Sequence, residues 1–258
     1  MGKININLIF LAKLVPVILI VIVLIVLEHF RMNEIKPDMT KVEGGMIQCS
    51  DLANYDDPDN EIAIIKDFFI GKYEVTQASY TIVMGENPSH FNRTNRNLPV
   101  EQVSWYEAVE FCNKLSKKSG LDTCYFDYGD SLKCDFEANG YRLPTRLEWT
   151  YAAKGGKLSK SYKYPGSNKV NKVIWYANNS KDTPHKVGKK KANELGIHDM
   201  GGNVNEWCWD GIRENSERCY CGGSFESNDK YCVFTYLCTA QPDSSRYDLG
   251  LRLCRSSK

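Results

Sequence analysis

The longest apolar stretch of the chain covers residues 8–27 and is interrupted only by Lys13 and Pro16. About 20 apolar residues cross a bilayer, whereas the apolar part of a signal peptide needs about 7 to 15, so this length suits either role. Glu28 follows the stretch directly, where a signal peptidase prefers small side chains. We therefore expect residues 1–27 to direct export, as an uncleaved anchor rather than a cleaved signal, with the membrane as a partner.

Beyond this segment the pattern of apolar and polar positions predicts few regular elements. Residues 28–41 are polar and are expected to form a tether, and residues 42–258 a single domain. Two stretches combine helical spacing with a capping box, in which Ser or Thr is followed three positions later by Glu. These stretches predict helices over residues 104–116 and 145–153.

A β-hairpin is expected over residues 124–134, because Gly129 and Asp130 separate two short strand-like runs. Each arm carries one cysteine, so Cys124 and Cys134 predict a cross-strand disulfide. The chain has ten cysteines in 258 residues, with no Cys-x-x-Cys pair and no zinc-binding Cys/His spacing. This usage favours an oxidising compartment.

Charge and composition exclude some classes of function. The chain is 42% apolar and 25% charged, with 33 Lys and Arg against 32 Asp and Glu, as in ordinary globular proteins. Its longest basic run is Lys189–Lys191. A nucleic-acid-binding protein concentrates positive charge on one face, so no nucleic-acid partner is expected.

Five motifs occur in a fixed order along the domain: Gly71–Gln77, Pro99–Trp105, Tyr141–Trp149, Gly202–Trp207 and Gly222–Phe225. In this order they resemble the formylglycine-generating-enzyme (sulfatase-modifying-factor) family of C-type-lectin-like domains. The resemblance implies an α+β fold of low regular-structure content, with two helices around a small twisted antiparallel sheet. Within the motifs, core or turn roles are expected for Trp105, Trp149, Trp207 and Arg142, because large side chains supply buried area where aliphatic runs are short.

A bound ion is expected in the segment from Asp199 to Glu206. Two carboxylates flank a Gly-Gly turn whose exposed carbonyls suit the six to eight oxygen ligands of calcium. The family resemblance implies one structural Ca²⁺ held by the side chains of Asp199 and Glu206 and by the carbonyls of Gly202 and Val204. The alternative is a polar turn in which Glu206 accepts backbone amides.

Catalysis in this family depends on two cysteines five positions apart that bind one Cu(I) ion between soft thiolates. The corresponding positions here are Ser227 and Cys232. One thiolate is missing, so no copper and no enzymatic activity are expected. An exported oxidase of the formylglycine-generating type that acts on a protein cysteine remains an alternative.

The departures from the family pattern cluster between Asn228 and Asp248. This arrangement resembles the variable proteins of diversity-generating retroelements, in which a C-terminal region of the same fold is rewritten to change a ligand-binding surface. It implies a bacterial, surface-displayed binding protein with residues 225–248 as its variable region and an unidentified protein or surface ligand as partner. Aromatic side chains are effective in recognition, and the expected ligand-binding residues are Asn228, Tyr231, Phe234, Tyr236, Ser245 and Tyr247.

Two alternatives remain open for this region. Its aromatic residues also suit a hydrophobic C-terminal core, and the chain also suits an invariant structural member of the same fold. The sequence leaves the ligand and the oligomeric state open.

Overall fold

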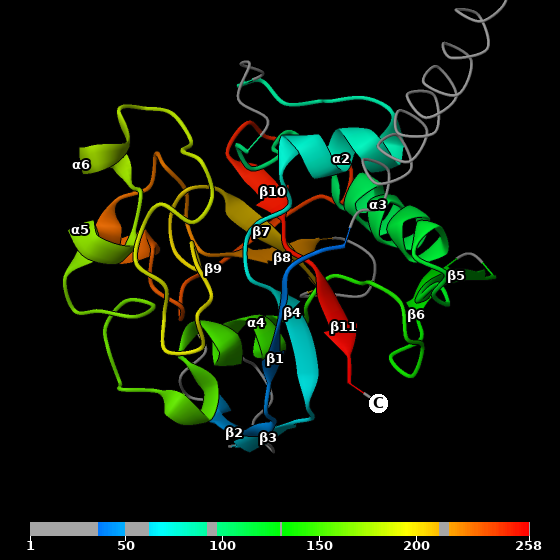
Figure 1. The fold of residues 1–258 in the computed structure, drawn as a ribbon, viewed down its shortest axis with the longest axis horizontal. Coiled ribbons are helices and arrows are strands. Elements are labelled where there is room, and N and C mark those ends of the chain that lie inside the picture. Colours follow the sequence, from blue (N-terminus) through cyan, green and yellow to red (C-terminus); the bar gives the residue numbers. More distant parts are fainter. Residues whose placement is uncertain (1–35, 50–61, 92–96, 130, 212–216, 258) are drawn as a thin grey trace, which may run out of the picture. The chain divides into compact units, whose positions relative to one another are not determined.

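Short strands in several small sheets form the frame of the domain. The computed structural model describes residues 36–49, 62–91, 97–129, 131–211 and 217–257. Within these ranges one sheet has the order β1-β4-β11, a second has the order β10-β7-β8-β9, and two ribbons pair β2 with β3 and β5 with β6 (Figure 1). The strands are β1 Met39–Val42, β2 Gly45–Gln48, β3 Ile62–Ile65, β4 Phe68–Gly71, β5 Tyr125–Tyr128, β6 Ser131–Cys134, β7 Asn205–Gly211, β8 Arg218–Cys221, β9 Leu237–Ala240, β10 Leu249–Leu251 and β11 Cys254–Ser256.

Both predicted helices are confirmed. Ser104 and Thr145 cap them, and each cap forms the full reciprocal box with the Glu three positions later. A further helix, α2, was not predicted; Thr76 caps its start, and Gly85 ends it with a φ of 92°. The helical segments are α2 Gln77–Met84, α3 Trp105–Lys118, α4 Arg146–Ala153, α5 Val170–Val173 and α6 Ala177–Ser180, with single 3₁₀ turns at η2 Gly156–Leu158 and η3 Asp229–Tyr231.

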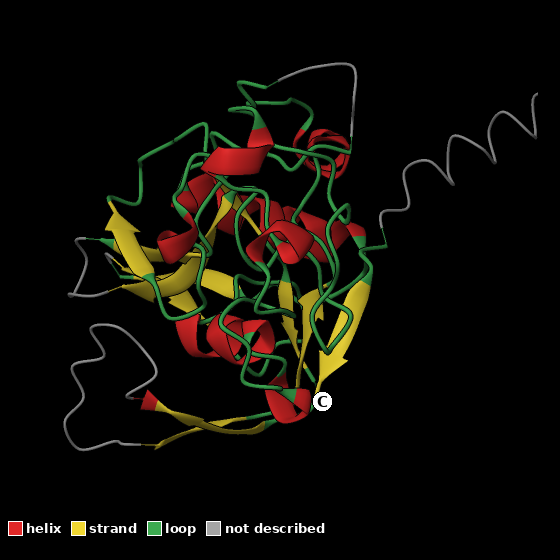
Figure 2. Cartoon of the chain, turned by 90° about the vertical axis from the view of Figure 1, so that its left-hand side faces the viewer, coloured by secondary structure: helices red, strands yellow, loops and turns green. Residues whose placement is uncertain are grey.

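The α+β class is confirmed, with two differences from the expected arrangement. In the described residues three further helices, α2 and the short α5 and α6, join the expected two, and β10 runs parallel to β7 in an otherwise antiparallel sheet. Figure 2 shows the β2–β3 ribbon along the lower edge of the domain. The architecture is thus several small sheets and ribbons joined by long irregular segments.

The core forms where α4 lies against β7 and β8. Trp105, Trp149, Trp207 and Arg142 are all buried, which confirms their predicted core roles. The indole of Trp207 donates to the Val103 carbonyl at 2.8 Å, so a polar atom is satisfied inside the core. Large aromatic side chains therefore pack together with the buried Val, Ile and Leu residues of the core.

The predicted hairpin is present as β5 and β6, but the disulfide expected within it is not formed. Cys124 and Cys134 are both free thiols. The register places Tyr125 directly opposite Cys134. Cys124 lies one position before β5, so it is diagonal to Cys134 rather than directly opposite it. The structure therefore does not show the disulfide predicted from one cysteine on each arm of the hairpin, and this bond stays a prediction.

Pro37–Lys258 forms one compact unit, and β1 begins at Met39, so the last residues of the expected tether pair with β4. The expected export segment, residues 1–27, lies outside the described residues. No helix in the described ranges is long and apolar enough to cross a membrane.

Candidate functional site

Glu206 on β7 lies at the centre of a buried ion pair. Arg252, just after β10, donates from Nη2 to Oε1 at 2.6 Å and from Nε to Oε2 at 2.9 Å. The indole of Trp149 on α4 also donates to Oε2, at 2.6 Å. Arg252 donates as well to the carbonyls of Gly71 and His198, at 2.9 and 3.0 Å. Both oxygens of Glu206 therefore already accept hydrogen bonds from the core.

Two further carboxylates are buried close to this pair. Glu74, which follows β4, accepts from the side-chain amide of Asn203 at 2.7 Å, and Asp199 accepts from the Gly188 amide at 2.6 Å. Burial and the neighbouring carboxylates raise the pKa of Glu74 well above its usual value, and burial also raises the pKa of Asp199. Three buried carboxylates thus surround the single guanidinium of Arg252.

The predicted calcium ligands lie on the turn between Asp199 and Glu206. Asp199 and Gly202 both have left-handed backbone, with φ of 56° and 71°. The excess of buried negative charge suits a divalent cation. Glu206, however, fits calcium only if its oxygens are shared with Arg252. No cluster of three or more His, Cys, Asp or Glu side chains in the described ranges has the arrangement of a metal site, and calcium at Asp199, Gly202, Val204 and Glu206 stays a prediction.

The two positions expected to correspond to a copper-binding pair hold Ser227 and Cys232. The hydroxyl of Ser227 accepts from the Ser224 amide at 2.9 Å, which ties it to the turn after β8. The thiol of Cys232 is buried and faces the Asn228 carbonyl at 3.6 Å. Burial raises the pKa of Cys232 to about 12. A neutral thiol and a serine hydroxyl together supply no thiolate pair to a Cu(I) ion.

Tyr231 and Tyr236 come together at the surface between η3 and β9. Their ring centroids are 4.7 Å apart, and the ammonium group of Lys230 lies 4.7 Å from the Tyr231 ring. Asp229 fixes the turn beneath them, because its carboxylate accepts from the Tyr164 hydroxyl at 2.6 Å. Both tyrosine side chains are half-buried. Each ring therefore packs against the domain on one side and is accessible to solvent on the other.

The remaining predicted ligand-binding residues differ in exposure. Asn228 and Ser245 are exposed, whereas Phe234 is half-buried and packs against the core cluster that contains Trp149. The ammonium group of Lys154 lies 5.6 Å from the Phe234 ring. Phe234 therefore has a structural contact in addition to any role at the surface.

Tyr247 belongs to a second aromatic group. It is 44% exposed and its hydroxyl donates to Glu226 at 2.9 Å. Its ring contacts Phe225, Phe91 and His90, at centroid distances of 6.3, 6.3 and 5.9 Å. His90 and Phe91 were missed from the sequence because they lie far from residues 225–248 along the chain. Only the folded chain brings them beside it.

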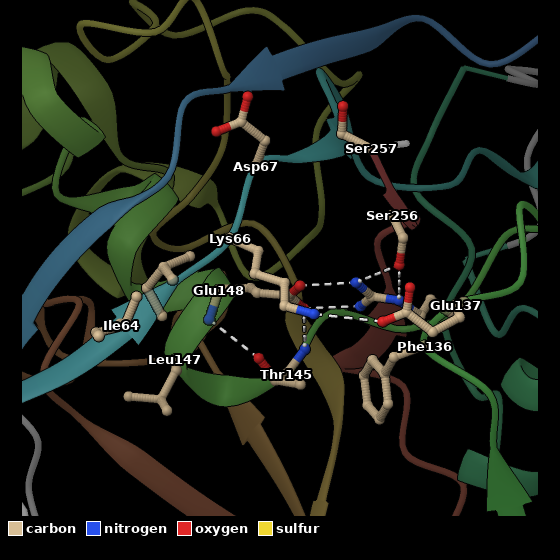
Figure 3. Close-up of a pocket in the computed structure, with 12 residues that line it drawn as sticks. Ile64, Lys66, Asp67, Phe136, Glu137, Thr145, Leu147, Glu148, Ser256 and Ser257 are labelled. Atoms are coloured by element: carbon tan, nitrogen blue, oxygen red, sulfur yellow. Dashed lines mark hydrogen bonds and ion pairs between the residues drawn. The ribbon is translucent and has the colours of Figure 1, made fainter.

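A separate pocket of about 410 Å³ lies between the β3–β4 turn, the start of α4 and β11. Figure 3 shows Ile64 and Leu147 on one side of this pocket and Phe136 and Glu137 on the other. The exposed ammonium group of Lys66 reaches Glu137 at 3.3 Å. The pocket is therefore lined by a mixture of apolar and charged side chains, including the Lys66–Glu137 ion pair.

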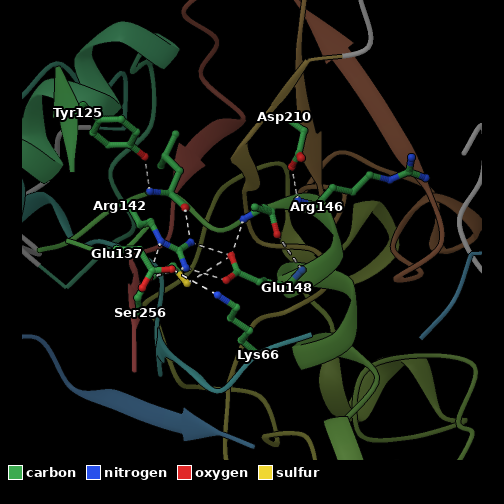
Figure 4. A network of polar contacts seen from close by, with 11 residues as sticks. Lys66, Tyr125, Glu137, Arg142, Arg146, Glu148, Asp210 and Ser256 are labelled. Carbon is green, nitrogen blue, oxygen red and sulfur yellow. Dashed lines mark hydrogen bonds and ion pairs between the residues drawn. The ribbon is translucent and has the colours of Figure 1, made fainter. Parts of the chain in front are cut away.

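Arg142 at the base of this pocket is already fully engaged (Figure 4). Its two Nη atoms donate to the two oxygens of Glu148 at 2.7 Å each, and Nε contacts Ser256 Oγ at 3.4 Å. Burial acts to raise the pKa of Glu148, but the Arg142 charge and the Thr145 hydrogen bonds hold it below its usual value. The Arg142–Glu148 pair therefore joins α4 to β11, which assigns it a structural role.

The geometry defines a class of protein, a C-type-lectin-like α+β domain whose C-terminal region carries exposed aromatic residues on a rigid frame. The chain belongs to the sulfatase-modifying factor enzyme 1-like domain family, whose model matches residues 27–257. This membership and the fold confirm the resemblance drawn from the five motifs.

Two relatives and one solved structure illustrate the range of the family. The chain is 38% identical to chaperone protein LppX of Paenibacillus barcinonensis over 86% of this chain and 90% of LppX. It is 32% identical to the formylglycine-generating enzyme of Streptomyces coelicolor, over 60% of this chain and 52% of that enzyme. The structure of Treponema denticola variable protein 1 superposes with a TM-score of 0.75 at 32% identity, over 87% of this chain and 96% of that one.

Proposed function

We propose that this protein is a non-enzymatic binding protein, exported and displayed at a bacterial surface, that recognises a protein ligand through residues 225–248. The observation that carries the proposal is the pair of aromatic groups around Tyr236 and Tyr247, each supported from beneath by the frame. Tyrosine gives large amphipathic contact at low cost in conformational entropy, which suits protein recognition. The 32% identity to Treponema denticola variable protein 1 supports a region that varies, and its diversification by a retroelement is part of the proposal.

The segments that flank residues 225–248 are fixed by the fold, so the residues between them can be substituted. Gly222 and Gly223, with φ of 102° and 71°, lie before the region, and a side chain at Gly223 would collide with the Tyr231 carbonyl. The strands β8 and β10 on either side both pair with β7. Substitutions at exposed positions between these anchors are therefore expected to alter the surface without altering the fold.

Binding is tested by single substitutions in each aromatic group. Photo-crosslinking from position 247 on intact cells first identifies the bound protein, and its affinity is then measured by interferometry. We expect Tyr236→Ala and Tyr247→Ala each to weaken binding about tenfold or more, as for aromatic anchors in other interfaces. Tyr128→Ala is the matched control, because Tyr128 is 71% exposed but lies on β5 outside the region.

A stability measurement separates the surface role from a core role. If Tyr236→Ala lowers the free energy of unfolding by several kcal/mol while the affinity is unchanged, Tyr236 belongs to the core and leaves the proposed surface. Equal losses of affinity in all three variants, including Tyr128→Ala, would exclude the region as the binding surface.

Display and diversification have their own tests. Protease treatment of intact cells should release the domain beyond residue 42 and leave the apolar segment with the membrane; full protection would contradict display. A near-repeat of the codons for residues 225–248 beside a reverse-transcriptase gene is expected in the flanking DNA. Without such a repeat the region is invariant.

The oxidase alternative is tested by copper. Wild-type protein should not bind Cu(I) with high affinity, because Ser227 supplies no thiolate. Ser227→Cys restores the second sulfur and is the matched variant. Tight Cu(I) binding by the wild type, together with oxidation of a cysteine-containing substrate peptide, would overturn the non-enzymatic proposal.

A second candidate function is chaperone-like binding of unfolded protein. It is supported by the 38% identity to chaperone LppX and by one surface feature. Met46 and Ile64 face each other across the β2–β3 ribbon, and they are 72% and 81% exposed. An exposed aliphatic cross-strand pair suits transient contact with apolar segments. In this case the protein should suppress aggregation of heated citrate synthase, and Met46→Ser with Ile64→Ser should abolish the effect, whereas Tyr247→Ala should not.

A further inference from the structure

Three cysteines share one face of the ladder between β7 and β8. The register pairs Glu206 with Cys221 and Trp207 with Tyr220. Because side chains alternate along a strand, Cys208 on β7 faces the same side as Cys219 and Cys221 on β8. All three thiols are at most 2% exposed and lie in the core cluster beneath α4.

Two of these thiols are in direct contact. The Sγ atoms of Cys208 and Cys221 are 3.9 Å apart, on neighbouring strands that Figure 1 shows side by side. The register between the two strands is irregular between Trp207 and Gly211, the stretch that contains Cys208. A disulfide needs a sulfur–sulfur bond of about 2.05 Å, and the two sulfur atoms are already in van der Waals contact, so a small rotation of the side chains is expected to close the bond.

We propose that Cys208 and Cys221 form a buried disulfide across β7 and β8 in the exported protein, with Cys219 as an adjacent free thiol. The pair is separate from the surface formed by residues 225–248, so this inference is independent of the proposed ligand. Like Cys124 and Cys134, Cys208 and Cys221 are free thiols in the structure, and the bond is proposed for the exported protein.

The chemistry is a thiol–disulfide exchange with a disulfide oxidant, either a protein or a small molecule. The thiolate of one cysteine attacks the oxidant, breaks its sulfur–sulfur bond and forms a mixed disulfide. The thiolate of the other cysteine then attacks the mixed disulfide, forms the Cys208–Cys221 bond and releases the oxidant as a dithiol. The two cysteines lose two electrons and two protons, and the oxidant gains both.

The fold determines when this exchange takes place. Burial raises the pKa of Cys208 well above its usual range, and burial raises that of Cys219 to about 12. Neutral thiols are poor nucleophiles, and these thiols are not accessible once α4 covers the ladder. The bond therefore forms during folding, before α4 docks, and the finished bond is protected from reductants in solution.

The test is a thiol map of the full-length protein exported through its own N-terminal segment. Cells are lysed in denaturant with an alkylating agent, and tryptic peptides are analysed without reduction. We expect the peptide with Cys208 linked to the peptide with Cys221. Because Cys219 lies on the same tryptic peptide as Cys221, the map is repeated with Cys219→Ser, which should keep the link, and with Cys221→Ser, which should lose it.

Reduction supplies a second measurement that does not depend on a variant folding. Dithiothreitol should leave the link intact in the native wild-type protein and should remove it completely in 6 M guanidinium. Recovery of Cys208 as an alkylated free thiol from the exported wild type would overturn the proposal. A link from Cys208 to Cys219, or to any cysteine outside the ladder, would overturn it equally.

Discussion

Replacing Arg252 by lysine tests whether the buried ion pair holds the frame together. Lysine keeps the charge but loses the planar guanidinium that contacts both oxygens of Glu206. Arg252 also satisfies the carbonyls of Gly71 and His198, and a hydrogen bond to a charged group contributes about 1.5 to 3 kcal/mol. Complete loss of a buried pair costs about 3 to 5 kcal/mol. Since lysine retains part of these contacts, we expect Arg252→Lys to lower the free energy of unfolding by about 2 to 4 kcal/mol.

Urea unfolding followed by tryptophan fluorescence measures this loss, because Trp149 donates to the same carboxylate. A domain of ordinary stability, about 5 to 15 kcal/mol, remains folded after such a change. Lys114→Ala is the matched control, since Lys114 forms an exposed i,i+4 pair with Glu110 at 2.8 Å, and such pairs contribute about 0.3 to 0.5 kcal/mol. An Arg252→Lys loss no larger than that of Lys114→Ala would refute the view that Arg252 anchors the frame.

Three further predictions concern the same frame. Millimolar calcium should raise the thermal midpoint of the wild type but not of Glu206→Gln, as mass action requires for an ion bound to the folded state. If calcium changes the midpoint of neither protein, the segment from Asp199 to Glu206 is a polar turn without a bound ion. Without calcium, Asp199 takes up protons on folding, because its folded pKa lies above the ordinary 3.8. Stability should therefore fall as pH rises through the folded pKa, and Asp199→Asn should flatten that slope in urea titrations; an unchanged slope contradicts the raised pKa. Ser104→Ala should cost about 1 kcal/mol by loss of the α3 cap, measured by thermal unfolding against the exposed Ser245→Ala.

The elements determined by local interactions could be predicted from the sequence. Ser104 and Thr145 identify the starts of α3 and α4 because a capping box acts within four residues. Helix α2 had comparable signals, a cap at Thr76 and a terminating Gly85, but no Glu at the third position to mark its start. Sheet order could not be predicted, since strands of three or four residues are too short for a diagnostic alternation.

The buried carboxylate site was predictable only in part, because some of its residues are distant in the sequence. Asp199 and Glu206 are close in sequence and carry a recognisable pattern. Their partners Glu74 and Arg252 come from distant segments, and only the fold brings them together. The signal available for these partners was a charge within an otherwise apolar run, such as Arg252 between Leu251 and Leu253. Such a charge is rarely buried unless it is paired.

The arrangement of the first sheet has a consequence for how the protein is made. β11, near the C-terminal end of the sequence, pairs with β4, and the segment at Arg142 also pairs with Cys254. Synthesis proceeds at about 5 to 20 residues per second, so β4, which can pair early with β1, waits many seconds for β11. The three-stranded sheet is therefore completed only after residues 225–248 have been synthesised.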